Sequence, residues 1–207
     1  MSDELKPFQS NHPYFIDIPP AAPGLAVTLD EAKEFLRADP PSDAELTLLI
    51  LAAQQCFEAY TRNTLLTTQY KLLHDYLLPS IEMHKTPFQS LTTFKYTVNG
   101  SLIDIDSALY YVYLKPDYSK ILVKDGESYP QDGDDILQGI EIKFKAGIAD
   151  DESGVPADIK LALLNHVAFL YENHGDCDNI DEVSILAALP KTSRLIYNKY
   201  RILKLVT

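Results

Sequence analysis

The chain has 207 residues, of which 46% are hydrophobic, and it carries a formal net charge of −12. This length is enough to bury a sizeable core in one domain, or in one domain with a large insertion. We expect neither a transmembrane span, which needs roughly 18 consecutive apolar residues, nor a secretory signal, and the negative charge argues against general adhesion to nucleic acid phosphates.

Residues 1–26 are predicted to form an extended arm. Prolines at positions 7, 13, 19, 20 and 23 remove backbone donors and restrict their neighbours, which disfavours a helix. Apolar residues such as Phe8, Phe15 and Ile16 are too numerous for a fully solvated tail. We therefore expect the arm to lie on its own domain or on a neighbouring one.

Residues 27–65 are predicted to form two helices. Each begins with a capping box, in which a Ser or Thr and a Glu three residues later satisfy each other's backbone donors. These pairs are Thr28 with Glu31 and Ser42 with Glu45. The first helix runs to about Ala38 and the second to about Arg62. The second carries apolar residues at three- and four-residue steps, as on one buried side: Leu46, Leu49, Ile50, Ala53, Phe57 and Tyr60.

Residues 66–146 are predicted to form an inserted antiparallel β-sheet. Thr, Tyr, Val and Ile are frequent there, and turn residues interrupt them about every ten positions. Asn99-Gly100 suits the positive φ angles of a type I′ hairpin turn. The predicted strands are Gln69–Leu77, Ser90–Val98, Leu109–Leu114, Lys120–Val123 and Gly139–Phe144, with a further extended piece at Ile81–Lys85. The acidic stretch 125–135 is predicted to be an exposed loop.

Helices return in residues 147–207. Pro156 suits a first helical turn, and an apolar side then continues to about Tyr171 through Ile159, Leu163, Val167 and Leu170. Residues 178–189 are predicted as a short helix or a loop. A final helix begins near Pro190 and runs toward Leu205. Its apolar side is predicted to contain Leu195, Ile196, Tyr200 and Leu203.

The order of these elements predicts an α+β fold. The N-terminal helix pair and the C-terminal helices form a small helical bundle, and the antiparallel sheet is inserted between them in the sequence. Residues 27–207 are then one composite domain, and residues 1–26 are an arm attached to it.

The closing segment is basic although the whole chain is acidic. Every charged residue from Pro190 to Thr207 is a cation: Lys191, Arg194, Lys199, Arg201 and Lys204. One explanation is that the cations face solvent and interact favourably with the dipole at the helix C-terminus. The alternative is a contact surface for an acidic partner, which could be another copy of the chain.

Motifs for catalysis and cofactor binding are absent from the sequence, including GxSxG, GxGxxG, GxxxxGK[ST] and HExxH. His166 and His174, with Cys177 and Asp178 nearby, are at most a partial metal site. A buried histidine and a histidine on the helix dipole explain the same residues. The two cysteines form no CxxC pair, so a disulfide framework is not expected. We predict no catalytic residue, cofactor or metal.

Several segments, in this order, resemble the head–tail connector proteins of tailed phages and prophages, also called adaptor or head-completion proteins. LAVTLDEAKEFLRAD and EAYTRNTLL resemble the opening helices, and HKTPFQSLTTFKYTVNG resembles a strand pair in the branch with an inserted sheet. IEIKFKAGIADDESGVPADIKLALLNHVAFLYENHGD resembles the strand and helix that follow, and LPKTSRLIYNKYR resembles the terminal helix. The resemblance covers roughly residues 25–202, apart from the details of 125–138 and 176–188.

The resemblance implies a structural virion protein, not an enzyme, assembled in the cytoplasm of a bacterial host. Such connectors form a ring, usually of about a dozen copies, beneath the portal protein. The ring extends the DNA channel and docks tail-side completion proteins. An anionic channel wall repels phosphates, so DNA passes without specific binding.

The candidate interface residues lie in the closing segment: Lys191, Arg194, Tyr197, Lys199, Tyr200 and Arg201. Three alternatives to a connector stay open. One is another phage tail-completion or morphogenesis module. The others are a small hydrolase or metal-binding enzyme and a DNA-binding regulator.

Overall fold

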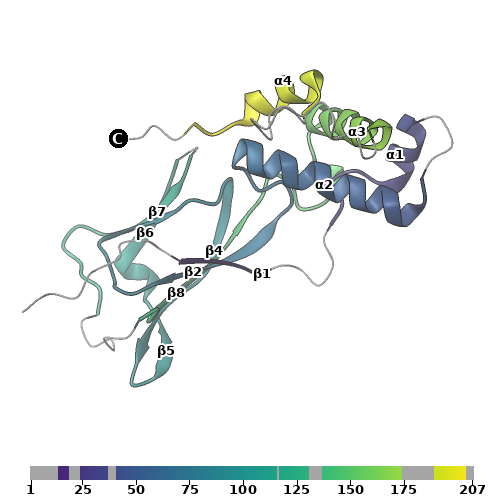
Figure 1. Ribbon diagram of the computed structural model, residues 1–207. Helices are drawn as coiled ribbons and strands as arrows, with labels where there is room; N and C mark the ends of the chain where they lie inside the picture. Colours follow the sequence, from purple (N-terminus) through teal and green to yellow (C-terminus); the bar gives the residue numbers. More distant parts are fainter. Residues whose placement is uncertain are drawn as a thin grey trace, which may run out of the picture.

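The computed structural model describes residues 14–18, 24–36, 41–115, 117–130, 137–173 and 189–203. A layer of helices lies at one end of a β region (Figure 1). The helices are α1 (Leu29–Leu36), α2 (Asp43–Thr61), α3 (Ala157–Glu172) and α4 (Lys191–Tyr200). Across the described ranges, none of the helices combines the length and apolarity that a membrane span requires. The predicted α+β class is confirmed.

The β region consists of two antiparallel sheets. The larger sheet has the order β1-β2-β8-β4-β5, with strands β1 (Tyr14–Ile18), β2 (Thr68–His74), β8 (Ile140–Ala146), β4 (Phe88–Val98) and β5 (Ser101–Asp104). The smaller sheet has the order β3-β7-β6, with strands β3 (Ser80–Met83), β7 (Ser119–Val123) and β6 (Tyr110–Leu114). The predicted strands are all present, but they are divided between two sheets.

The predicted extended arm contains the edge strand β1. It pairs antiparallel with β2, from Tyr14 opposite Leu73 to Ile18 opposite Gln69. The large sheet therefore includes a strand from outside 66–146. The rest of the arm, at 1–13 and 19–23, lies outside the described residues.

Hydrogen bonds confirm both predicted helix starts. The Thr28 N–H donates to Glu31 Oε2 at 2.8 Å, and the Glu31 N–H donates to Thr28 Oγ1 at 3.1 Å, as a capping box requires. At the start of α2, the Glu45 N–H donates to Ser42 Oγ at 3.3 Å.

The helices and the sheets each have their own hydrophobic core. The helical core includes Leu46, Ile50 and Phe57 of α2, and Ile159, Leu163 and Val167 of α3. The β core includes Tyr70, Leu72, Phe94, Ile121, Ile142 and Phe144. The predicted apolar sides of the two long helices therefore do face a core.

Gly147 lies where the chain passes from β8 to the helical layer. A Cβ atom at this position would lie 2.5 Å from Thr67 Cα and 2.6 Å from Thr67 N. The backbone here is hydrogen-bonded on both sides, since the Thr67 N–H donates to Ala149 O at 2.8 Å and the Gly147 N–H donates to Pro87 O at 2.9 Å. This close approach fixes how the helical layer joins the large sheet.

The closing helix ends earlier than predicted. Tyr200 is its last residue, and Arg201 is extended. The Ile202 N–H donates to Thr61 O at 2.9 Å, and Asn63 Nδ2 donates to Tyr200 O at 2.6 Å. These bonds draw the chain onto the end of α2, so an apolar residue at position 203 does not prolong the helix.

The buried side of α4 agrees with the prediction only in part. The partly buried Ile196 and Tyr200 pack against the helical core as expected. Leu195 is 73% exposed and Leu203 is 70% exposed, whereas Ser193 and Tyr197 are fully buried. Ser193 Oγ donates to Ala162 O of α3 at 2.8 Å. A small polar residue lets the two helices approach closely there, and hydrophobicity alone does not reveal such a position.

Candidate functional site

The six predicted interface residues lie on α4 and at its C-terminal end, but they do not share one surface. Tyr197 is fully buried in the helical core. Its ring meets Phe57 edge to face, with 5.0 Å between centroids, and its hydroxyl lies 3.4 Å from His166 Nδ1. Tyr197 therefore holds α4 against α2 and α3 and is not exposed to a partner.

Lys199 and Tyr200 both bind Asp158 in the first turn of α3. Lys199 Nζ lies 2.8 Å from Asp158 Oδ2, and the Tyr200 hydroxyl donates to Asp158 Oδ1 at 2.8 Å. The hydrogen bond from Lys199 is the largest cause of the lowered pKa of Asp158. These contacts hold the C-terminal end of α4 against α3. The sequence does not predict them, because Lys199 and Tyr200 are 41 and 42 residues away from Asp158.

Lys191 and Arg194 are exposed and form no salt bridge with any residue that the structure describes. Arg201 lies beside α2, with its guanidinium carbon 5.0 Å from the centroid of the Tyr60 ring. Arg201 is nevertheless exposed. The accessible part of the predicted site therefore comprises Arg201 and the outer side of α4, where Lys191 and Arg194 flank the exposed Leu195. The exposure of Leu195 is the feature that the sequence analysis missed.

An acidic surface lies away from α4, where α1, the start of α2 and the loop before α3 meet. Asp30, Asp43 and Glu152 are exposed and line one hollow there, and the exposed Glu34 follows Asp30 by one turn of α1. Lys33 offsets part of this charge through a 2.6 Å salt bridge to Asp43. In Figure 1, α1 and α4 lie at opposite ends of the helical layer, so the two oppositely charged surfaces are well separated.

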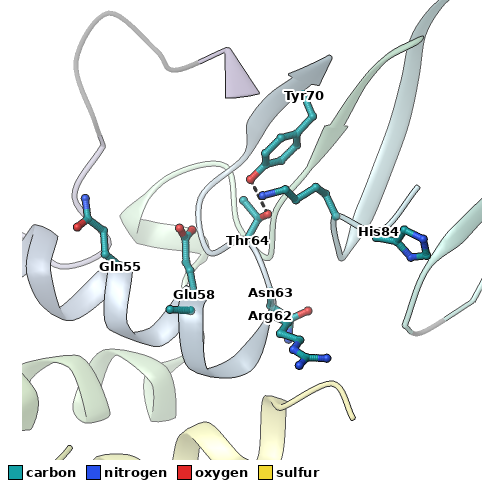
Figure 2. A pocket seen from close by; sticks show the side chains of 9 residues that line it. Gln55, Glu58, Arg62, Asn63, Thr64, Tyr70 and His84 are labelled. Atoms are coloured by element: carbon teal, nitrogen blue, oxygen red, sulfur yellow. Dashed lines mark hydrogen bonds between the residues drawn. The ribbon is translucent and has the colours of Figure 1, made fainter. Parts of the chain in front are cut away.

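A polar cleft of about 500 Å³ lies where the end of α2 meets the β region (Figure 2). Several of its polar side chains are already bonded within the protein. Glu58 Oε1 accepts from the Leu65 N–H at 2.7 Å, and the Thr64 and Tyr70 hydroxyls lie 2.8 Å apart. Figure 2 shows Glu58 and His84 on opposite sides of the cleft, so they are not arranged as an acid–base pair. The cleft is a polar junction between the helical layer and the β region.

The candidate metal ligands are only partly placed. His166 lies in the helical core and is 1% exposed, whereas His174, Cys177 and Asp178 lie outside the described residues. Within the described ranges, no group of three or more His, Cys, Asp or Glu side chains could hold a metal ion.

The burial of His166 gives the fold a pH dependence. Burial lowers the pKa of His166 from 6.5 to about 4. As the pH falls below 6.5, the unfolded chain therefore takes up a proton that the folded chain does not. The stabilisation by neutral His166 is complete above about pH 6.5 and decreases toward pH 4, by about 3 kcal/mol in total.

Urea denaturation of the wild type and of His166→Gln between pH 4 and pH 7 tests this expectation. The wild type is expected to lose about 3 kcal/mol more than the variant over this range, because glutamine does not titrate. Carboxylates also titrate here, but they are common to both proteins and cancel in the difference. Parallel stability curves would contradict the assignment.

Comparison with known proteins reveals a shared fold but no match by sequence. No family model matches the chain, and neither does any curated protein. Its structure is similar to a chain in the neck of an empty gene transfer agent (GTA) particle in C6 symmetry, with a TM-score of 0.71 and 19% sequence identity. It is also similar to a chain in the virion of a native GTA particle, with a TM-score of 0.69 and 20% sequence identity. A third similar chain, in the neck of a native GTA particle in C12 symmetry, has a TM-score of 0.68 and 19% sequence identity.

These similarities extend over nearly the whole of both molecules. Each covers 93% of this chain and 97% of the matched chain. The arrangement of the helical layer and the two sheets is therefore that of a protein found in the neck of such particles.

Proposed function

We propose that this chain, which has the fold of a gene transfer agent neck protein, is a structural component of the neck of a phage-like particle. In this role it is a head–tail connector. It forms a ring under the portal protein, extends the DNA channel and docks tail-side completion proteins. The observation that carries the proposal is the structural similarity over 93% of this chain and 97% of the neck protein.

The symmetry of the matched necks supports a ring. Two of the three structures are necks in C6 and C12 symmetry. A ring needs a contact that joins two different surfaces of the subunit, and the rotation between copies must close. The separated basic and acidic surfaces of the helical layer are suited to such a contact.

The charge of the chain supports a channel function. A subunit with a net charge of −12 repels DNA phosphates wherever its acidic residues face the channel. DNA then passes without specific binding. The same charge disfavours a DNA-binding regulator, which needs cations to neutralise phosphates.

The closing segment is the proposed docking surface. Tyr197 is buried in the core, and Lys199 and Tyr200 are bound to Asp158. The residues that remain for docking are Lys191, Arg194 and Arg201. Their partner is an acidic surface, either of the portal or of a neighbouring copy. We propose no catalytic role for the chain.

Particles assembled without the chain test this function. A connector is needed for tails to join, so we expect DNA-filled heads without tails, and tailed particles once the wild-type chain is supplied. Complete tailed particles in its absence would contradict the proposal. Antibody detection on separated heads and tails distinguishes the connector, which stays with heads, from a tail-completion protein, which stays with tails.

A further inference from the structure

The outer side of α4 presents a leucine between cations. Leu195 is 73% exposed, and the helix turns it almost directly away from the buried Tyr197. Lys191 precedes it by one turn and shares its side, and the exposed Arg194 is adjacent. One exposed leucine needs no explanation by itself. Its meaning depends on whether the molecule also contains a surface that fits it.

A groove between α1 and α3 has the complementary chemistry. It is a cavity of about 500 Å³ lined by Glu31, Glu34, Phe35 and Leu164. Phe35 and Leu164 are partly buried and form an apolar floor, and the glutamates form an acidic rim. Leu161, one turn before Leu164, is 49% exposed and extends the apolar surface.

The two glutamates of the rim differ in their bonding. Glu31 binds Lys160 Nζ at 2.7 Å and caps α1. The negative charge of Glu31 is therefore already balanced by Lys160. Glu34 is exposed and forms no salt bridge within the described part of the chain. Glu34 is therefore the acidic group that is available to an incoming cation.

The position of α4 keeps Leu195 from its own groove. Figure 1 shows α1 and α4 at opposite ends of the helical layer, and α4 is fixed to α3 through Ser193, Tyr197 and Tyr200. A second copy of the chain can reach the groove. Because the leucine and the groove belong to different surfaces, such a contact repeats head to tail and closes into a ring when the rotation allows.

We propose that Leu195 of each copy inserts into the α1–α3 groove of the next copy, with Lys191 and Arg194 facing Glu34. This inference rests on the proposed ring and names its subunit interface. The apolar contact supplies affinity, and the opposite charges set the direction and suppress the reverse pairing.

Cysteine cross-linking of the full chain tests the contact. The double variant Glu34→Cys/Leu195→Cys is expected to form a ladder of disulfide-linked oligomers under mild oxidation at high protein concentration. Each single variant is expected to match the wild type, whose own cysteines serve as the background. A ladder from the double variant alone supports the head-to-tail contact. A dimer from Leu195→Cys alone would mean a symmetric contact and would overturn the proposal.

Charge exchange gives a second readout. Arg194→Glu and Glu34→Arg are each expected to weaken self-association by at least about tenfold. The double variant Arg194→Glu/Glu34→Arg is expected to recover most of it, because the exchanged charges again face each other. Arg62→Glu is the matched control, since Arg62 is exposed but lies outside the contact.

Ring formation, measured separately by light scattering, keeps this inference distinct from the proposed function. A wild-type ring whose double cysteine variant gives no ladder would overturn the contact and leave the neck function standing. A chain that stays monomeric both alone and with the portal protein would overturn both.

Discussion

Tyr197→Ala is expected to lower the free energy of unfolding by about 3 to 5 kcal/mol, the range for removing a buried aromatic ring. Tyr197 is fully buried between α2 and α3, and its ring packs edge to face on Phe57. Alanine leaves a cavity there and removes the hydroxyl near the buried His166. Chemical denaturation at neutral pH measures the loss.

Two controls separate the roles of the ring and the helix position. Tyr197→Phe keeps the ring and is expected to cost about 1 kcal/mol. Leu195→Ala lies on the same helix but is exposed, so its cost should stay within about 0.5 kcal/mol. If Tyr197→Ala cost no more than Leu195→Ala, Tyr197 would not be the anchor of α4. Loss of partner binding in Tyr197→Ala would reflect this anchoring and not a direct contact.

Gly147→Ala is expected to destabilise the protein by about 3 kcal/mol, at the upper end of the range for overpacking. The new Cβ atom would lie 2.5 Å from Thr67 Cα and 2.6 Å from Thr67 N, and both are backbone atoms that no rotamer change can move. The passage from β8 to the helical layer would have to shift. The bond from the Thr67 N–H to Ala149 O would shift with it.

Gly154→Ala is the matched control for this substitution. Its Cβ atom would lie 3.2 Å from Ala149 Cβ and 3.8 Å from Ala149 Cα, so no backbone atom would come closer than ordinary van der Waals contact. Gly154 also lies on the same connection between β8 and α3. Urea denaturation of both variants gives the comparison. Equal stabilities would show that the backbone approach at Gly147 does not constrain the fold.

The features that the sequence predicted correctly depend on neighbouring residues. The capping box of Thr28 and Glu31 brings its partners together within one helical turn, so its pattern is visible in the sequence. The Asn99-Gly100 turn is equally local, and both residues have the predicted positive φ angles. The long helices follow from apolar periodicity over many residues.

The features that the sequence did not reveal depend on distant contacts. β1 pairs with β2 although 49 residues lie between the two strands. Prolines on both sides of β1 argue against a strand in the sequence, so the pattern does not reveal it. The division into two sheets depends on which strands pair, and strand composition does not specify this. The end of α4 is set by Thr61 and Asn63, which belong to the other half of the chain.

The candidate site was only partly accessible to sequence reasoning for the same reason. Composition identified a basic closing segment, but it could not separate Tyr197, which is fully buried, from Leu195, which is 73% exposed. Ser193 and Tyr197 are one helical turn apart and define the side that faces α3. The α1–α3 groove joins residues from the two ends of the chain, so no local pattern could predict it.

The mass of the complex between this chain and the portal protein tests the central proposal most directly. Light scattering of the portal ring with excess chain should show an added mass equal to many copies per portal ring, because a ring closes only when all its subunits are present. About a dozen copies is the number expected for a connector ring. An unchanged portal mass, or the addition of a single copy, would contradict the assignment of the chain as a connector that forms a ring in the neck.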